Sequence, residues 1–598
     1  MNNIFHLTSH VLPLLTLPMP LLAQEGAAEK ERPNVIVVMT DDQGIGGLSC
    51  HSNPYLKTPC LDKFYEESVR LTDFHVSPFS TPTRAAIITG RYPVRNGAWA
   101  TYKGRDIISG DDLTIADVFQ QAGYATALFG KWHLGDNYPS RPTDSGFDYA
   151  VHHRAGGVSE LSDYWGNSYF DDTYIVNNEP KAFKGYCTDI WFGEAISYIR
   201  RQQETDKPFF IYLATNAAHD PHLVDSRYSK PFQPLEDSKK LRSAGFYGQI
   251  VNMDENFGRL EAFLSESGLK ENTILVFLTD NGAGAPNSCW TDGYRGAKGN
   301  NYEAGHRVPF FIRWIKGGLH GGKDIDGLTA HVDLLPTLSS LCGIKRTDTE
   351  TLDGIDISPL LYSRAGKEME ERNLFIHFRQ DSKQPHDVKN SCVMHKNWRL
   401  INGNELYDLD KDKAQANNVA DAHPEIVQSL LAANSAFMAE TKQSPEYKEF
   451  VPVALGAEAQ QTATLTIQHA MGDDPGLWKS AQVAEGMKNR NNAYVVDVVS
   501  AGTYRISLAR WARECPGSIH GVPTTNPKGQ FVYKAIRPEK ARIVVGEKVY
   551  TKDITPDMTE VAFDVQMPQG TCVLKTDFVE GGEAYGVYYT YIEKIKNQ

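Results

Sequence analysis

The sequence predicts an α/β protein with a large mixed, mostly parallel sheet covered by helices, a small antiparallel C-terminal subdomain and an appended β-sandwich domain. Three observations predict it: apolar runs that alternate with helical patterns, a later group of short strands, and a final stretch of alternating apolar and polar residues. The chain has 598 residues, of which 41% are hydrophobic and 23% charged. This composition is typical of a globular protein and excludes collagen, coiled-coil, disordered and multi-span membrane proteins.

The first region carries five apolar runs that predict strands. Their β-branched residues are continuous rather than alternating, which is typical of parallel strands buried on both faces. The runs cover residues 34–39, 125–129, 208–215, 273–279 and 308–314. Helical patterns over 113–121 and 190–202 lie between them, and such alternation favours a parallel sheet covered by helices. We assign this region, residues 24–372, to one α/β domain.

Two smaller regions follow. Residues 373–451 contain short strands with an Asn402-Gly403 turn, which predict an antiparallel meander, and then an amphipathic helix over 424–441. Residues 452–598 contain alternating strands separated by turn residues, which predict a β-sandwich. No strand face there is rich in aromatic residues, so we expect this domain to pack on the rest for stability rather than to bind a glycan.

The N-terminus carries an apolar stretch over residues 11–23 that three prolines interrupt, so it cannot span a bilayer as one helix. Ala23 precedes a polar switch, which predicts a signal peptide over residues 1–23 and a secreted or periplasmic protein without a transmembrane segment in the mature chain. An irregular N-terminal arm is the alternative. The eight cysteines form no C-x-x-C pair, which argues against a thiolate zinc site and leaves disulfide pairing open.

The formal net charge is −13, from 61 basic and 74 acidic residues. A chain this acidic, without a block of lysines or arginines, is not expected to bind nucleic acid or an anionic lipid surface. An anionic substrate would need a local cationic site that acts against the field of the whole protein.

Polar residues follow four of the predicted strands directly, and ligands of open α/β sheets bind beyond the carboxyl ends of the strands. We therefore expect one site there. Its members are Asp41, Asp42, Lys131, His133, His219, Asp280 and Asn281.

The oxygen donors of this set are Asp41, Asp42, Asp280 and Asn281, without a cysteine or histidine among them. Hard oxygen ligands favour Ca²⁺, with Mg²⁺ as the alternative, over zinc. The surrounding cations are Arg84, Lys131 and Lys298. With three carboxylates and one divalent ion, they leave a local charge of about +2 when the histidines are neutral, which would attract an anion.

The stretch Ser80-Thr-Pro-Thr-Arg84, extended by Thr89-Gly90-Arg91, resembles the sulfatase signature. Pro82 fits the first turn of a helix, so Ser80 would lie near a helix N-terminus, where free N–H groups favour an anion. Seven further blocks resemble formylglycine-dependent sulfatases of the alkaline phosphatase superfamily. They are residues 40–42, 130–135, 280–282, 295–299, 303–309, 331–336 and 405–409. The resemblance covers roughly residues 34–418 and implies an alkaline phosphatase-like fold.

The resemblance also implies a mechanism. Ser80 would be oxidised to formylglycine, whose hydrate is a geminal diol, and one hydroxyl, held on the metal and deprotonated with help from Asp280, would attack sulfur. His219 would protonate the leaving oxygen, and His133 would deprotonate the other hydroxyl, which expels sulfate. The metal ligands would be Asp41, Asp42, Asp280, Asn281 and the modified Ser80. Arg84, Lys131 and Lys298 would stabilise the charge on sulfate and on the diol.

Two departures from the family pattern matter. The nucleophile position holds Ser80 rather than cysteine, which implies an anaerobic, serine-accepting radical maturase as partner. His219 follows Ala217-Ala218, where the family often has Ala-Pro, so His222 is the competing candidate for the role of His219 and is otherwise expected to bind substrate.

The expected substrate is a sulfated carbohydrate, because a secreted serine-type sulfatase with an added β-domain resembles those that gut-type anaerobic bacteria use on host or dietary glycans. Sulfated galactose or N-acetylhexosamine is the more specific hypothesis. Trp99, Trp165 and Trp290 could stack on sugar rings, although tryptophans more often cover a core.

Two alternatives stay open. A phosphatase or phosphodiesterase of the same superfamily would use unmodified Ser80, but such enzymes commonly have Asp-His-Gly where this chain has Asp280-Asn281-Gly282. A carbohydrate-binding protein whose Ser80 is never matured is the second alternative.

Overall fold

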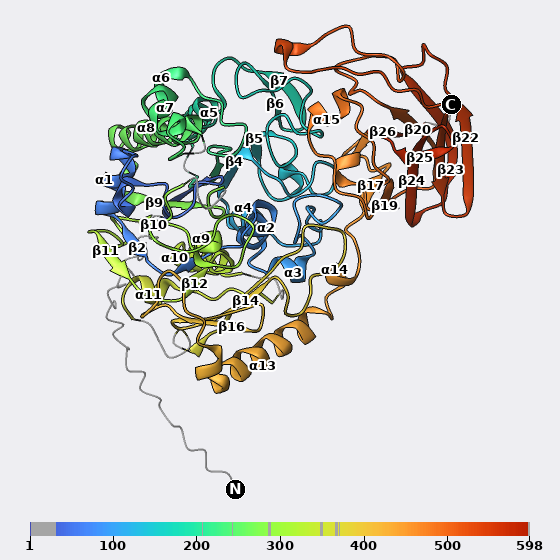
Figure 1. Ribbon diagram of the computed structural model, residues 1–598. Coiled ribbons are helices and arrows are strands. Elements are labelled where there is room, and N and C mark those ends of the chain that lie inside the picture. Colours follow the sequence, from blue (N-terminus) through green and yellow to red (C-terminus); the bar gives the residue numbers. More distant parts are fainter. Residues whose placement is uncertain are drawn as a thin grey trace. The chain divides into compact units, whose positions relative to one another are not determined.

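The largest sheet of this computed structural model has ten strands and is mixed (Figure 1). The structure describes residues 1, 32–205, 207–241, 243–284, 289–346, 351–364, 369 and 371–595. The signal peptide expected over residues 1–23 lies, apart from Met1, outside the described residues. The strand order is β11 (Lys323–Ile325), β2 (Val69–Leu71), β10 (Phe310–Arg313), β9 (Thr273–Thr279), β1 (Asn34–Thr40), β8 (Phe209–Ala214), β4 (Ala125–Lys131), β5 (Tyr149–His153), β6 (Thr173–Val176) and β7 (Glu179–Ala182).

The five strands from β9 to β5 run parallel; the continuous apolar runs predict four of them, β9, β1, β8 and β4, but not β5. β10 is different, because it pairs antiparallel with β9. A parallel neighbour needs a crossover connection, usually a helix. The described part of the chain between β9 and β10 contains only the four-residue helix α9 (Glu303–His306), so the chain re-enters the sheet from the edge where β9 ends.

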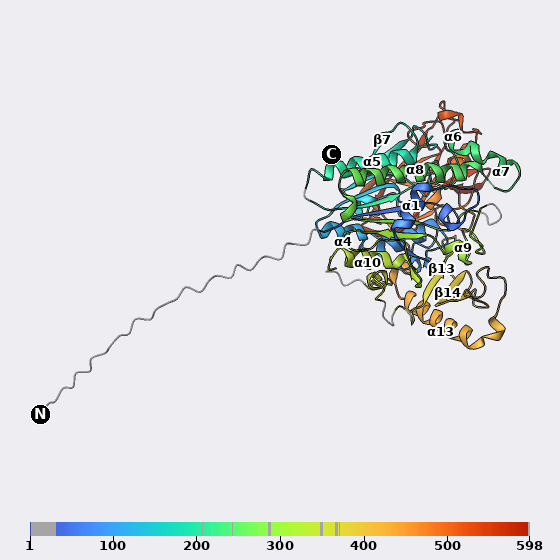
Figure 2. The same ribbon diagram turned by 90° about the vertical axis from the view of Figure 1, so that its left-hand side faces the viewer.

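Helices cover both faces of this sheet (Figure 2). On β1, Ile36 and Val38 pack with one helical layer, whereas Val35 and Val37 pack with the other, as the two-residue period of a strand requires. The first layer consists of α1 (Pro59–Glu67), α5 (Cys187–Gln202) and α8 (Ala244–Glu266). The second consists of α2 (Ser80–Thr89), α4 (Ile115–Gln121) and α10 (Leu334–Leu341).

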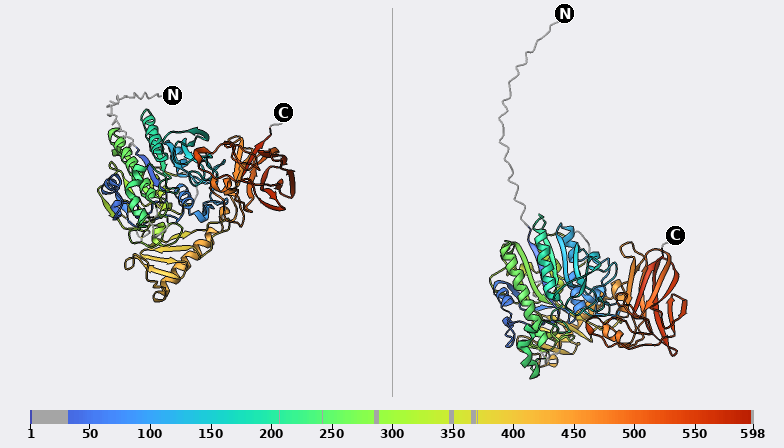
Figure 3. Two further views of the ribbon diagram at one scale, coloured as in Figure 1. Left: turned by 45° about the horizontal axis from the view of Figure 1, so that its top comes forward. Right: turned by 90° about the horizontal axis from the view of Figure 1, so that it is seen from above.

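A four-stranded antiparallel sheet follows, formed by β13 (Leu374–His377), β14 (Ser391–His395), β15 (Trp398–Ile401) and β16 (Glu405–Asp408). Asn402 and Gly403 both have positive φ in the turn between β15 and β16, which explains the Asn-Gly pair there. Helix α13 (Pro424–Thr441) packs on this sheet through Leu430 (Figure 3, left).

The last part of the chain is a sandwich of two sheets, here called the C-terminal sandwich (Figure 3, right). One sheet has the order β17 (Val453–Leu455), β19 (Ala493–Val498), β24 (Gly570–Glu580), β21 (Lys540–Val545) and β22 (Lys548–Asp553), with β25 (Glu583–Gly586) beside β24. The other has the order β18 (Thr462–Thr466), β26 (Tyr589–Lys594), β20 (Gly502–Ala509) and β23 (Glu560–Met567). The inward side chains of both sheets share one apolar core.

The shorter elements are β3 (Phe74–His75), β12 (Thr329–Ala330), α3 (Pro93–Asn96), α6 (Ser226–Ser229), α7 (Gln233–Asp237), α11 (Ser358–Leu361), α14 (Pro445–Lys448) and α15 (Ser480–Ala484). Residues 33–598 group into one compact unit, so the C-terminal sandwich belongs to the same body as the large sheet. Within the described ranges, we find no helix with the length and apolar character needed to cross a membrane.

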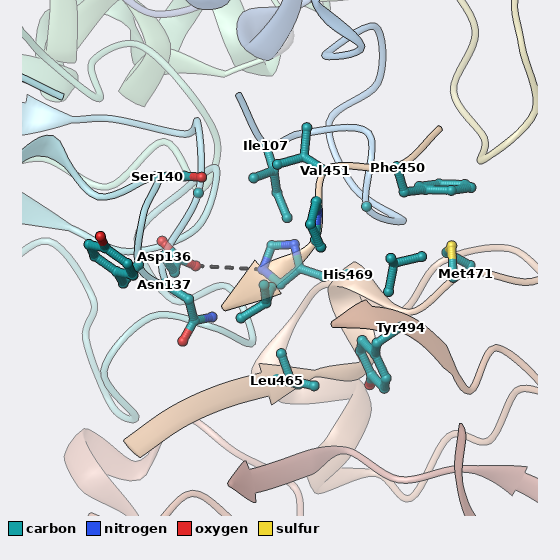
Figure 4. A pocket seen from close by; sticks show the side chains of 16 residues that line it. Ile107, Asp136, Asn137, Ser140, Phe450, Val451, Leu465, His469, Met471 and Tyr494 are labelled. Atoms are coloured by element: carbon teal, nitrogen blue, oxygen red, sulfur yellow. Dashed lines mark ion pairs between the residues drawn. The ribbon is translucent and has the colours of Figure 1, made fainter. Parts of the chain in front are cut away.

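The C-terminal sandwich meets the large α/β region at a small cavity of about 30 Å³ (Figure 4). His469 lies between two carboxylates there, with Nδ1 2.8 Å from Asp106 Oδ2 and Nε2 3.5 Å from Asp136 Oδ2. The contact to Asp106 is a close ion pair rather than a well-aligned hydrogen bond. Burial alone would lower the pKa of His469, but Asp106 and Asp136 raise it to about 10.

This histidine should make the stability of the protein dependent on pH. Because the pKa of His469 is higher in the folded protein than the ordinary 6.5, its stabilising effect is complete below about pH 6.5 and is lost as the pH rises toward 10. We expect His469→Gln to lower the melting temperature most near pH 6, with a difference that shrinks toward pH 10. The control is His423→Gln at a more exposed imidazole, and a difference independent of pH would contradict the prediction.

Candidate functional site

The carboxyl ends of four adjacent strands meet at one edge of the large sheet, in the order β9, β1, β8 and β4. Asp41 and Asp42 follow β1, and Asp280 and Asn281 follow β9. Because β1 and β9 are paired in parallel up to Thr40 and Thr279, these four side chains arrive at the same level. The strand pairing thus brings Asp41, Asp42 and Asp280, here called the acidic cluster, together at this edge of the sheet.

Three carboxylates form the floor of the site. Asp41, Asp42 and Asp280 are buried, and each offers an oxygen within 4.8 Å of the others. The Asp42 N–H donates to Asp280 Oδ1 at 3.1 Å, and Asn281 Nδ2 donates to Asp42 Oδ1 at 2.7 Å. Such a set of oxygen donors can hold a hard divalent cation.

Each of these carboxylates has its own cation. Lys131 Nζ lies 2.6 Å from Asp41 Oδ2, Arg84 Nη2 lies 2.9 Å from Asp280 Oδ2, and Lys298 Nζ lies 2.6 Å from Asp42 Oδ1. The pairs come from different segments, because Arg84 lies on α2, Lys131 ends β4 and Lys298 follows β9 by about twenty residues in the loop before α9. Three negative and three positive charges therefore balance within the site.

Asp41 and Asp42 are held in the ionised form. Burial alone would raise the pKa of Asp41, but Lys131 and His219 hold it below its ordinary value. Burial would likewise raise the pKa of Asp42, but Lys298 and His219 keep it low. Ionised, buried oxygen ligands fit the hard divalent ion that the donor chemistry predicts.

Ser80 is the first residue of α2, at the helix N-terminus, and it is buried. Its Oγ donates to Asp41 Oδ1 at 3.1 Å and lies 3.3 Å from Asn281 Oδ1. Lys131 Nζ donates to the same Oγ at 3.1 Å. The serine hydroxyl is thus held between an acidic cluster and a lysine, next to free N–H groups of the helix.

Two histidines lie at the same cavity. His133 Nε2 lies 3.2 Å from the Thr101 carbonyl oxygen, and its Nδ1 is buried without a hydrogen-bond partner among the described residues. Burial, with Lys131 and Arg84 nearby, holds the pKa of His133 well below its ordinary value, so the imidazole is neutral. His219 Nδ1 is 2.7 Å from the Asp220 carbonyl oxygen, and its Nε2 is 3.9 Å from Asp42 Oδ2.

His222 is placed differently. It lines a neighbouring cavity of about 200 Å³ together with Phe246, whose ring it meets edge-on, and with Asp42 and Lys298. The cavity that contains Ser80 is lined by His219 and not by His222. Of these two histidines, His219 is therefore the one that lines the cavity of Ser80.

The cavity that contains Ser80 has a volume of about 410 Å³. Its walls come from three parts of the chain: the large α/β region, the segment that follows β13, and the C-terminal sandwich. The lining residues are Phe79, Ser80, Thr101, Tyr102, Lys131, His133, Gly156, Glu160, His219, Asp220, Lys298, Gln380, Gln468, Trp478 and Lys479. The expectation that the C-terminal domain only packs for stability is therefore incomplete.

Sequence patterns did not single out Tyr102, Glu160, Gln380, Gln468 or the pair Trp478-Lys479. None of them belongs to a motif, and the contacts between them join segments hundreds of residues apart, so no local signal could have found them. The tryptophans considered for sugar stacking lie elsewhere. Trp99 and Trp165 are 0% and 3% exposed and cover core, and Trp290 is 36% exposed but does not line this cavity.

Comparison with known proteins matches residues 33–344 to the sulfatase family model. The chain belongs to the sulfatase family. A second model, the C-terminal part of N-sulphoglucosamine sulphohydrolase, matches residues 297–438 of this sulfatase. Neither model extends into the C-terminal sandwich.

Individual relatives and a solved structure also match this chain. N-acetylgalactosamine-6-sulfatase of Canis lupus familiaris is 30% identical over 391 residues, which cover 61% of this chain and 72% of the relative. The uncharacterized sulfatase YdeN of Escherichia coli is 27% identical, and the match covers 70% of this chain and 87% of YdeN. The crystal structure of Ps i-CgsB has a TM-score of 0.62 at 22% identity, over 70% of this chain and 95% of that one. This sulfatase is a sulfuric ester hydrolase with the predicted α/β fold.

Proposed function

We propose that this sulfatase hydrolyses O-sulfate monoesters of a carbohydrate, through a formylglycine made from Ser80 and a divalent metal, Ca²⁺ or alternatively Mg²⁺. The observation that carries the proposal is the position of Ser80 Oγ. It lies at a helix N-terminus, within 3.3 Å of Asp41, Asn281 and Lys131 and beside three buried carboxylates.

The metal would be held by Asp41, Asp42, Asp280, Asn281 and the modified side chain at position 80. When bound, it supplies positive charge that polarises the sulfate ester and favours an ionised nucleophile. Lys298 Nζ now contacts both oxygens of Asp42, at 2.6 and 2.8 Å, so it is also placed to contact an anion beside this carboxylate. Arg84 Nη2 donates to Asp280 Oδ2 at 2.9 Å and so orients this carboxylate.

Formylglycine, when hydrated, supplies a geminal diol, in which one hydroxyl attacks sulfur and the other allows sulfate to leave. The residues around position 80 have separate tasks. Lys131 Nζ donates a hydrogen bond to the oxygen at this position. His133 is neutral and buried, so it can accept a proton at Nδ1, which has no hydrogen-bond partner among the described residues.

We propose His219 as the acid that protonates the leaving oxygen. His219→Gln should lower kcat/KM on a sugar sulfate by roughly 10²–10³, because a sugar alkoxide leaves poorly without a proton. An aryl sulfate, whose phenolate leaves more easily, should lose much less. His222→Gln, in the neighbouring cavity, is the matched control. If both substrates slow equally, or if His222→Gln gives this pattern, the assignment is wrong.

The substrate class is supported by what the relatives are named for. The dog enzyme is an N-acetylgalactosamine-6-sulfatase, and the structure of the neighbour BT4656, with a TM-score of 0.56 and 21% identity, is a complex with its substrate D-glucosamine-2-N,6-O-disulfate. We propose a sulfated galactose or N-acetylhexosamine as the substrate unit.

We also propose a signal peptide over residues 1–23, export by a bacterial-type pathway to the periplasm or medium, and domains over 24–372, 373–451 and 452–598.

The maturation of Ser80 is proposed to need an anaerobic, serine-accepting maturase. To test the proposed function, the protein is co-produced with such a maturase and assayed for sulfate release from a small aryl sulfate. Mass spectrometry of the peptide that contains Ser80 should show the loss of two hydrogen atoms. Sulfate release by protein whose Ser80 is wholly unmodified would contradict the proposal.

A further inference from the structure

We infer that residues 468–479 of the C-terminal sandwich form a saccharide subsite of the cavity that contains Ser80, with Trp478 as the surface on which the leaving-group sugar packs. The inference rests on the proposed function, since it names where the alcohol part of the sulfate ester binds. The two family models end at residues 344 and 438, before this segment.

The cavity that contains Ser80 has both cationic and aromatic lining residues. Ser80, Lys131 and Lys298 line it together with Trp478 and Lys479 of the sandwich. The cationic groups fix where the sulfate lies, so the rest of a ligand faces the remaining walls. A cavity of about 410 Å³ with one aromatic wall and a few placed polar groups is typical of a small-ligand site.

Backbone pairing fixes the position of this wall. Glu160 and Lys479 form an antiparallel β-bridge, and the Leu161 N–H donates to the Trp478 carbonyl oxygen at 2.7 Å. Ser480 Oγ donates to the Glu160 carbonyl oxygen at 3.2 Å. Trp478 is therefore held by backbone contacts to the large α/β region and does not depend on a flexible linker.

The side chain of Glu160 adds a second connection. Its Oε2 accepts from Gln468 Nε2 of the sandwich at 2.7 Å and from the Gly156 N–H at 3.0 Å. Gly156 packs directly on His133, since a β-carbon added there would lie 2.4 Å from the imidazole Cε1. The sandwich thus supports the loop that covers one of the proposed catalytic histidines.

The aromatic surface consists of two rings. Trp478 stacks on Tyr102 with ring centroids 6.0 Å apart and an interplanar angle of 20°. Gly476 lets the backbone lie on the Tyr102 ring, where an added β-carbon would come within 2.8 Å of ring atoms. Trp478 is still 36% exposed, so part of its face is open to a ligand. The C–H face of a sugar ring can pack on such an apolar surface.

A hydrogen-bond donor lies in the same cavity. Gln380 Oε1 accepts from Thr101 N at 3.1 Å and from Thr101 Oγ1 at 2.9 Å, which fixes the amide orientation. Gln380 Nε2 is buried and has no hydrogen-bond partner among the described residues. An unpaired buried N–H group is costly, and a sugar hydroxyl would satisfy it.

The test uses full-length, matured enzyme and compares two substrate types. The saccharide probe is the best substrate from a panel that contains galactose 6-sulfate, N-acetylgalactosamine 6-sulfate and disaccharides that end in them, and the reference is a small aryl sulfate. We expect Trp478→Ala to lower the ratio of kcat/KM on the saccharide to kcat/KM on the aryl sulfate about tenfold. Trp478→Phe should restore most of the ratio, because it keeps an aromatic face.

Trp290→Ala is the matched control, since Trp290 is also 36% exposed but lies outside this cavity, and it should leave the ratio unaltered. The subsite is overturned if Trp478→Ala has the same ratio of saccharide to aryl sulfate kcat/KM as the wild-type enzyme. It is also overturned if the wild-type enzyme hydrolyses the aryl sulfate but none of the saccharides. If matured wild-type enzyme hydrolyses no sulfate ester, the proposed function fails, and the inference falls with it. Melting curves identify a Trp478→Ala protein that fails to fold, in which case Gln380→Ala decides: a lowered ratio supports the subsite, and a wild-type ratio overturns it.

Discussion

Replacing Ser80 by alanine is expected to lower sulfate release by a factor of roughly 10⁴ or more, because the change removes the only atom at this position that can become the nucleophile. The fold should persist. Within the part of the chain that the structure describes, Ser80 Oγ makes hydrogen bonds only to residues of the site, and α2 is anchored by buried residues such as Ala85 and Ile88. Sulfate release and the melting temperature of the two proteins are measured side by side.

Ser77→Ala is the matched control, because Ser77 is buried three residues before Ser80 but bonds to His331 instead of the acidic cluster. It should retain most of the activity. Wild-type protein produced without a suitable maturase should behave like Ser80→Ala: folded and nearly inactive. Substantial turnover by Ser80→Ala would show that the nucleophile has been misassigned.

Removal of the divalent metal by a chelator should abolish turnover, and Ca²⁺ or Mg²⁺ should restore it. The effect on folding should be smaller. Each of Asp41, Asp42 and Asp280 already has a cation, so the carboxylates do not face one another unpaired when the ion leaves. Binding an ion at a hundredfold excess over Kd stabilises a protein by about 2.7 kcal/mol, so we expect a modest fall in melting temperature.

Asp42→Asn should abolish the shift in melting temperature that Ca²⁺ causes, whereas Asp292→Asn should preserve it. Asp292 pairs with Lys413 away from the acidic cluster. Restoration of activity by zinc alone would favour the phosphatase alternative over the sulfatase mechanism.

Much of the site could be predicted because it follows directly from strand ends. Asp41 and Asp280 come immediately after continuous apolar runs, so a sequence pattern that places the strands also places the carboxylates. Lys298 does not follow a strand end, and its Gly-rich loop predicts only that it can approach an anion closely; its contact with Asp42 brings it into the site.

Other features depend on contacts that no local pattern encodes. The direction of β10 follows from how the chain returns to the sheet, and its apolar residues would suit either direction. The bridge between Glu160 and Lys479 joins residues more than 300 positions apart. The sequence around Trp478 does not predict its proposed role, because that role depends on the bridge and on the Tyr102 ring.

The same bridge has a consequence for evolution. The chemistry lies at strand ends of the large sheet, whereas the wall around Trp478 lies in a segment of the sandwich that is attached at a few backbone contacts. Substitutions within residues 470–479 can therefore change the shape of the cavity without moving the acidic cluster or Ser80. Gene duplicates of this sulfatase could diverge toward different sugars by altering that segment while inheriting the catalytic groups intact.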